Sequence, residues 1–174
     1  FNFTDFMYRP RRPEELDPAR GGGVVFSQAA HQIDMVRRLA GRKLRAIRAS
    51  SGNWDAARPS DGAYAALLFF DGGATASLTY SGYAHYDSDE LMGWIGELGH
   101  VKDAEQYGAA RRSLPRQDEG DAKLARTYGK GALPAPAPHL EHSGFVLASC
   151  ERADIRLTPT GLAIYADAAR EWRP

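Results

Sequence analysis

The sequence predicts an α+β fold: a predominantly antiparallel, open-faced sheet with its helices on one face. Three observations lead to this prediction. One segment near the N-terminus has apolar residues at helical spacing, and several later segments have the length and the period of two that are typical of strands. Most of those strands are joined by short turns rather than by crossover helices, as antiparallel neighbours are. Because the helices would cover one face, the other face needs a partner.

The N-terminal part of the chain is predicted to be a short strand followed by a loop. Residues 1–8 begin by alternating phenylalanine with asparagine and threonine, which is typical of a strand covered on one side. The stretch "RPRRPEELDPARGGG" (9–23) contains three prolines, each of which lacks a backbone donor and restricts the residue before it. It is therefore predicted to be a loop, and it carries Arg9, Arg11, Arg12 and Arg20.

Residues 28–39 are predicted to form a helix with one buried stripe. The apolar positions recur at steps of four, three and four, and they are Ala29, Ile33, Val36 and Ala40. Ser27 is the natural N-cap, because a serine hydroxyl can accept from an open amide of the first turn. Gly41 can end the helix, since glycine adopts the left-handed conformation that closes a C-terminus.

Three strands are expected next, at 43–50, 63–70 and 74–84. In the last of them alanine, leucine and tyrosine occupy one face while threonine and serine occupy the other. Asp71-Gly72-Gly73 predicts a tight hairpin before this strand, because glycine accepts the positive φ of such turns.

The segment 87–138 is predicted to be largely irregular. Glycines weaken a short helix at 88–98, and "GKGALPAPAPHLEHSG" (129–144) is too rich in proline and glycine for a regular element. A long irregular segment inside a compact domain is usually functional or flexible. Three more strands are expected at 145–150, 154–159 and 162–165, the last two joined at Thr160-Gly161.

Composition indicates one ordinary globular domain. Lys plus Arg balances Asp plus Glu at 22 each, which gives no reason to expect nucleic acid or a membrane as partner. Cys150 is the only cysteine, so an internal disulfide is impossible and a reducing, cytoplasmic location is expected. Within its predicted strand Cys150 is expected to be a small core residue rather than a nucleophile. No run approaches the ~20 apolar residues of a membrane span.

Ser27, His31 and Asp34 form the main candidate site. They follow each other at steps of four and three, so one helical face presents all three, turned away from the apolar stripe. A histidine near the positive pole of a helix favours its neutral form, which suits general acid–base work, and Asp34 could orient the ring. On spacing alone, a half-exposed polar face without chemistry is the better interpretation.

Other groups carry weaker signals. The glycine run has the spacing of neither a dinucleotide fingerprint nor a P-loop, and a close backbone approach or a tight turn explains it better. His139 and His142 fall short of a zinc signature, so no metal is predicted. The arginines of the loop could bind carboxylates, although solvated loop charge is the better interpretation from the residues alone.

The chain resembles the glucose–fructose oxidoreductase, inositol dehydrogenase and MocA family (Gfo/Idh/MocA) in its C-terminal domain. The resemblance rests on the glycine run followed by "VVF", Ser27, His31 and Asp34. The stretches "FMYRPRRPEELDPARGGGVVFSQAAHQIDMVRRL" and "HLEHSGFVLASCERADIRLTPTGLAIYAD" are similar to the branch with phthalate dihydrodiol dehydrogenases.

Membership of this family would imply a two-domain oxidoreductase whose N-terminal Rossmann domain binds NAD or NADP. This chain, 1–174, would then be the substrate and oligomerisation domain, a fragment that begins with phenylalanine rather than methionine and is inactive alone. It has no dinucleotide fingerprint and no Glu-Lys-Pro motif of the kind that supplies a catalytic lysine in the family. The implied partners are a hydroxylated small molecule, the chain's own Rossmann domain and further copies in a homo-oligomer.

The resemblance also implies roles for single residues. His31 would act in or beside proton transfer with the substrate hydroxyl, and Asp34 would orient the site. Ser27 stands where many sugar-oxidising members have aspartate, which favours a non-sugar substrate such as a cyclic diol or a carboxylated dihydrodiol. The candidate substrate-binding residues are Ser27, Gln28, Arg11 and Arg12. The alternative is a non-catalytic sheet module for subunit assembly.

Overall fold

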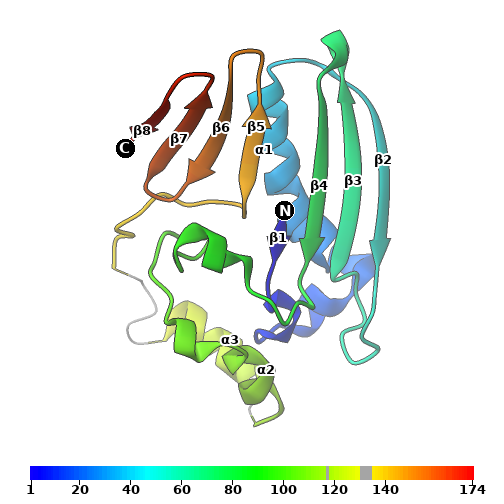
Figure 1. Cartoon of the computed structure of the whole chain (residues 1–174). Helices are drawn as coiled ribbons and strands as arrows, with labels where there is room; N and C mark the ends of the chain where they lie inside the picture. Colours follow the sequence, from blue (N-terminus) through cyan, green and yellow to red (C-terminus); the bar gives the residue numbers. More distant parts are fainter. Residues whose placement is uncertain (117, 130–134) are drawn as a thin grey trace. The chain divides into compact units, whose positions relative to one another are not determined.

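The computed structural model describes residues 1–116, 118–129 and 135–174, and it divides them into two compact units. The larger unit holds residues 3–86, 108–116 and 118–129, and the smaller unit holds residues 1–2, 87–107 and 135–174. Each unit is built around a four-stranded antiparallel sheet (Figure 1). The predicted α+β class with antiparallel pairing is therefore confirmed. The strands form two separate sheets, however, whereas the sequence predicts one.

The sheet of the larger unit has the strand order β1-β4-β3-β2. Its members are β1 (Asn2–Phe3), of which Phe3 belongs to the larger unit, β2 (Leu44–Gly52), β3 (Ala63–Phe70) and β4 (Thr75–Ser81). The predicted hairpin between β3 and β4 is confirmed: the Phe70 amide donates to the Ala74 carbonyl at 2.9 Å. Gly72 and Gly73 in this turn have φ of 81° and 88°, which residues with a Cβ rarely adopt.

The predicted helix is confirmed, but it begins differently. Val25–Ala29 forms a π-helical turn that leads directly into α1 (Ala30–Ala40). Ser27 lies inside this turn, and its hydroxyl donates backwards to the Gly23 carbonyl at 2.9 Å. The prediction of Ser27 as N-cap is therefore wrong, because the chain is already helical at Val24 and the Ser27 hydroxyl donates to a carbonyl instead of accepting from an amide. Gly41 ends α1 as expected, with φ of 60° and its amide bonded to the Arg37 carbonyl.

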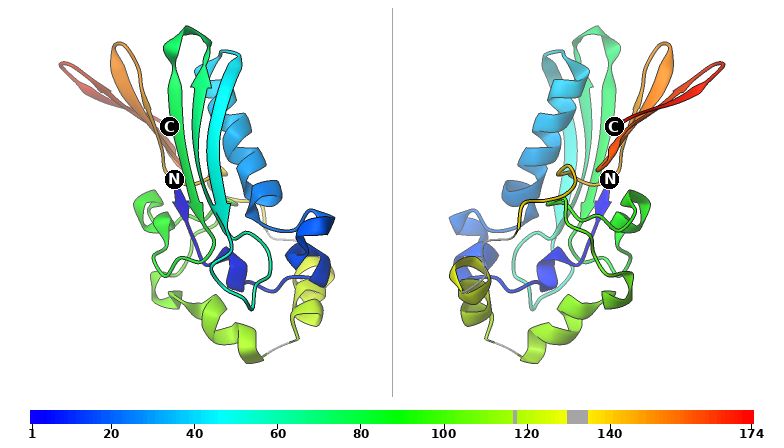
Figure 2. Two further views of the ribbon diagram at one scale, coloured as in Figure 1. Left: turned by 90° about the vertical axis from the view of Figure 1, so that its right-hand side faces the viewer. Right: turned by 90° about the vertical axis from the view of Figure 1, so that its left-hand side faces the viewer.

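The core of the larger unit lies between α1 and one face of its sheet (Figure 2). Ala29 is buried there, and the rest of the predicted stripe on α1 packs against the same cluster. The strands contribute Tyr64, Leu68, Phe70, Leu78 and Tyr80, which confirms the period of two in β4. On the opposite face of β3, Leu67 is half exposed.

The sheet of the smaller unit is a meander with the order β5-β6-β7-β8. Its strands are β5 (Val146–Ser149), β6 (Ala153–Thr158), β7 (Gly161–Ala166) and β8 (Arg170–Arg173). The first three match the predicted late strands, and β8 was not predicted. Cys150 is exposed, so its prediction as a core residue is wrong. The reason is that β5 ends at Ser149, and Cys150 belongs to the turn, where its amide donates to the Ala153 carbonyl.

The segment predicted to be irregular contains two α-helices, α2 (Ala109–Ser113) and α3 (Glu119–Tyr128). Asp118 caps α3 by accepting from the Asp121 amide at 2.8 Å, a start signal that the sequence analysis missed. Residues 88–92 form a 3-10 helix that ends at Gly93 with φ of 70°. Of the proline-rich stretch, 130–134 lie outside the described residues, and 135–144 form neither helix nor strand, as predicted. None of the described helices is both long enough and apolar enough to span a membrane.

Candidate functional site

The polar line predicted on the helix is present at its start. Ser27, in the π-helical turn, and His31, in the first turn of α1, are both exposed, and Gln28 between them is partly buried. The neighbours on the other side of the same turns, Ala29 and Gln32, are buried. The helix therefore presents His31 outward while its opposite side is anchored in the core.

Asp34 is bonded to arginines one turn further along α1. Its two carboxylate oxygens accept from Arg37 at 2.7 Å and from Arg38 at 2.9 Å. These hydrogen bonds hold the pKa of the Asp34 carboxyl below its usual value. Both oxygens thus have arginine partners, and the expected orientation of His31 by Asp34 stays a prediction.

The glycine run in front of the helix is closely packed against neighbouring backbone. A Cβ on Gly22 would lie 2.7 Å from the Glu15 carbonyl oxygen and 2.8 Å from backbone atoms of Asp17. The amides from Gly21 to Val24 donate to the carbonyls of Pro18, Asp17, Glu15 and Asp61, in that order, at 2.8–3.2 Å. A phosphate-binding loop needs amides that point at the ligand, so this run does not fit the pyrophosphate of a dinucleotide.

Arg11 and Arg12, the predicted carboxylate-binding pair, lie in very different surroundings. The Arg11 guanidinium stacks 3.5 Å above the ring of Phe6, donates to the Phe6 carbonyl at 3.0 Å and lies 3.5 Å from Glu15. Its side chain is 11% exposed, and burial lowers its pKa to about 10. The Arg12 side chain is 48% exposed, with Glu14 and Glu15 at 3.3 and 3.5 Å. Of the two, Arg12 has the guanidinium that a ligand can reach.

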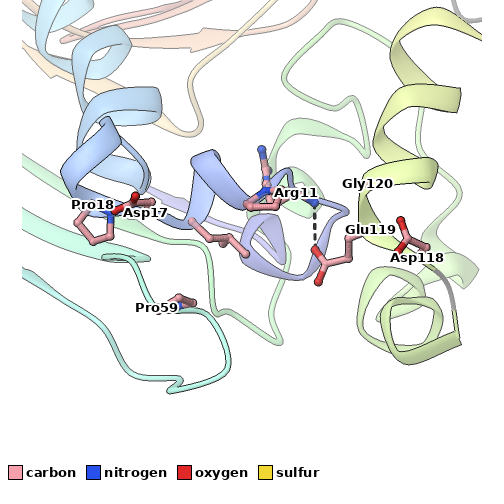
Figure 3. A pocket seen from close by; sticks show the side chains of 9 residues that line it. Arg11, Asp17, Pro18, Pro59, Asp118, Glu119 and Gly120 are labelled. Carbon is pink, nitrogen blue, oxygen red and sulfur yellow. Dashed lines mark hydrogen bonds between the residues drawn. The ribbon is translucent and has the colours of Figure 1, made fainter.

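An ion pair that the sequence did not reveal, between a buried arginine and a partly exposed glutamate, holds the loop of Arg11 in place. The Arg58 side chain, 4% exposed, binds Glu119 of α3 through two contacts of 2.6 and 2.9 Å. Arg58 also donates to the Met7 carbonyl, while Glu119 accepts from the Arg11 amide at 3.0 Å (Figure 3). The Asp118 cap was the one sequence signal for Glu119 at the start of a helix, and Arg58 carried none.

Glu119 borders a cavity of about 670 Å³. Its walls are formed by loop and helix-end residues that include Pro13 and Leu16. Pro18 and Pro59, which also line it, are labelled in Figure 3. The carboxylates at its rim are engaged inside the protein: Asp17 accepts from the Ala19 amide and Asp118 from the Asp121 amide, while Glu119 binds Arg58. The cavity therefore offers a ligand apolar surface but few uncommitted charges.

In the smaller unit, His142 has a structural role. Its Nδ1 accepts from the Gly144 amide at 3.1 Å, so its Nε2 carries the proton and donates to the Ile95 carbonyl at 2.8 Å. Nearby, the Lys102 ammonium binds both Asp87 and Asp89. Burial raises the pKa of the Asp89 carboxyl despite the lysine. His142 thus fastens the segment 87–102 to the loop before β5, and Lys102 ties the two ends of that segment together.

Comparison with known proteins adds a family and two relatives. The model of the GFO/IDH/MocA C-terminal domain matches residues 1–102. The 1-carboxy-3-chloro-3,4-dihydroxycyclohexa-1,5-diene dehydrogenase of Comamonas testosteroni is 44% identical, with 95% of this chain and 44% of that protein covered. A solved structure of a protein assigned as a dehydrogenase, from Bordetella bronchiseptica RB50, is 40% identical with a TM-score of 0.92.

The match to the Bordetella structure covers 100% of this chain and 46% of that protein. This chain therefore spans less than half the length of both relatives. A structure assigned as an oxidoreductase, from Thermotoga maritima, covers 94% of this chain and 36% of its own length. Its TM-score is 0.54 at 11% identity, so that likeness concerns the fold alone.

Proposed function

The chain belongs to the GFO/IDH/MocA family, and from this premise we propose that it binds the substrate of an oxidoreductase that oxidises a hydroxyl group. The proposed substrate class is a cyclic diol that carries a carboxylate, because the relative from Comamonas is named for such a compound. The observation that carries the proposal is the exposed His31 on a helix whose other side is fixed in the core.

The cofactor of the proposed reaction is NAD or NADP, which dehydrogenases of this family generally use. In this chain the amides of the glycine run are bonded to backbone carbonyls, so we assign no part of a dinucleotide cradle to that run. We propose that a Rossmann domain outside this chain binds the cofactor, since the two relatives are more than twice as long as the matched region. The isolated chain is then expected to be inactive.

Within this chain, His31 is proposed to accept the proton of the substrate hydroxyl as general base. Ser27 and Gln28 border the same side of the helix and are proposed to contact the diol. Arg12 is proposed to bind the carboxylate, because its guanidinium is half exposed while that of Arg11 is engaged with Phe6 and Glu15. If Arg12→Ala leaves the KM for the diol unchanged in the full-length enzyme, this assignment of Arg12 is wrong.

His31→Ala in the full-length enzyme tests the proposed function. With the diol named for the Comamonas relative as probe, the variant is expected to lose about 100-fold or more in kcat while its affinity for the dinucleotide stays unchanged. Leu39→Ala is the matched control, since Leu39 is an exposed residue of the same helix. Wild-type turnover in the His31 variant would contradict a catalytic role.

A second candidate function is subunit assembly, which the open face of the β1-β4-β3-β2 sheet favours. Leu67 is 50% exposed at the centre of β3, among small polar residues of β4 such as Ser77. We propose that this face contacts a second copy in a homo-oligomer. Leu67→Glu is expected to lower the mass measured by light scattering, and an unchanged mass would argue against this face. If turnover survives His31→Ala while Leu67→Glu dissociates the oligomer, assembly is the better account.

A further inference from the structure

Gln32 is the buried residue of α1, and it follows His31 directly in the sequence. Its side chain is 4% exposed, and its Oε1 accepts a hydrogen bond of 2.9 Å from the Tyr64 hydroxyl of β3. A buried polar contact of this kind is directional, because a hydrogen bond weakens quickly when its geometry changes. It therefore ties one point of the helix to one point of the sheet.

The tyrosine that makes this contact is itself fixed. The Tyr64 ring stacks on the Tyr80 ring of β4, with centroids 5.6 Å apart and planes 9° from parallel. Both side chains are buried, at 7% and 1% exposure. The Tyr64 hydroxyl is thus aimed at α1 by packing within the sheet, and it cannot follow the helix if the helix turns.

The apolar part of the contact between α1 and the sheet is weakly directional. Two of the four stripe residues, Ala29 and Ala40, are alanines, and Ile33 and Val36 are only partly buried. Apolar packing of this kind is non-directional and tolerates small rotations. Successive residues of an α-helix lie about 100° apart around the axis, so the direction of Gln32 also decides the direction of His31.

We propose that the hydrogen bond from Tyr64 to Gln32 positions His31 for its reaction with the substrate. Tyr64 and Gln32 are positioning residues in this proposal, since neither is exposed to a ligand, and the inference rests on the proposed function of His31. Without the bond, α1 can rotate about its axis, and the imidazole then spends less time in the productive direction. The loss falls on kcat rather than on KM.

The test is a double-mutant cycle in the full-length enzyme, with NAD(P) and the diol named for the Comamonas relative as probe. Tyr64→Phe keeps the ring and removes the hydroxyl, and it is expected to lower kcat about 5- to 10-fold, the effect of one hydrogen bond. KM should stay unchanged. In the His31→Ala background the same substitution should have no further effect on kcat, because the residue that it positions is gone.

Tyr83→Phe is the matched control. Tyr83 belongs to the same unit and is 8% exposed, and its hydroxyl donates to Asn53 and to the Ser60 carbonyl rather than to α1. It should leave kcat unchanged. Gln32→Leu removes the acceptor instead of the donor and should reproduce the loss and the coupling of Tyr64→Phe, so the test remains decisive if one variant folds poorly.

The outcomes separate the two claims. If His31→Ala loses turnover but Tyr64→Phe and Gln32→Leu either leave kcat unchanged or multiply the His31 loss, the positioning role is wrong and the proposed function stands. If His31→Ala keeps wild-type turnover, the proposed function is wrong and the positioning role is overturned with it.

Discussion

Two charged regions of the larger unit differ in what their side chains do. In the arginine loop, 9–20, the Arg11 guanidinium is bound to Phe6 and Glu15 and the loop backbone to Glu119, while the Arg12 guanidinium is half exposed. The start of the helix, 25–34, leaves Ser27 and His31 exposed. The difference shows that density of charge is a poor guide to a site. A functional side chain needs a fixed backbone and a head group that a ligand can reach, and His31 on the helix and Arg12 in the loop meet this condition while Arg11 does not.

The sharpest test of the internal role of the loop is Arg58→Ala. The variant leaves the Glu119 carboxylate without its buried partner and removes the contact with the Met7 carbonyl. It is expected to lower the free energy of unfolding by about 3 kcal/mol, because it removes the charged hydrogen bonds of a buried guanidinium. Urea denaturation measures this. Arg38→Ala, which removes an exposed partner of Asp34, is the control and should change stability little. Equal losses of stability in the Arg58 and Arg38 variants would contradict the internal structural role of Arg58.

The glycine run joins the two regions, and alanine substitutions test how tightly. In Gly22→Ala the new Cβ would push backbone atoms of Glu15 and Asp17 away from residue 22. The substitution is therefore expected to lower the free energy of unfolding by about 2–3 kcal/mol. Gly21→Ala meets no atom within 4 Å, and its cost is only the strain of φ at 81°, about 1 kcal/mol. Thermal denaturation compares them. A Gly21 variant less stable than the Gly22 variant would contradict the close packing of Gly22 against Glu15 and Asp17.

The pH dependence of stability gives a smaller effect. Burial alone raises the pKa of Glu119, but hydrogen bonds from Arg58 and from the Arg11 amide outweigh it and hold the pKa below its ordinary 4.5. The unfolded chain therefore takes up this proton first as pH falls. The stabilising contribution of Glu119 is present above that ordinary value and is lost as pH falls through the lower folded value.

Urea midpoints measured from pH 6 to about pH 3 test this contribution. Glu119→Gln is the matched variant, and its stability is expected to fall less steeply with acid than that of the wild type. Parallel curves for the two proteins would show that Glu119 does not contribute.

The sequence was informative where contacts are local. The stripe on α1, the Gly41 end and the Asp71-Gly72-Gly73 turn follow from residues within a few positions, and all were predicted. The π-helical entry was not predicted, and just before it the Val24 amide is bonded to the Asp61 carbonyl, which lies far along the chain.

The same limit applies to the site. His31 and its polar line were visible as helical spacing, but the anchoring of the Arg11 backbone amide depends on Glu119, 108 positions away. Gln32 carried a signal that was overlooked: it lies three positions after Ala29 and four before Val36, a polar residue among stripe positions. The strand β8 is short, charged and exposed, so no alternation marked it.

The most direct test of the difference between the two regions uses the variants His31→Ala and Arg11→Lys of the full-length enzyme. Their kcat and KM for the diol are measured side by side. Because His31 is exposed on a fixed helix, its loss should lower kcat about 100-fold or more. Because the Arg11 guanidinium is engaged inside the protein, Arg11→Lys should change neither constant. A raised KM in the Arg11 variant together with an unchanged kcat in the His31 variant would contradict the account.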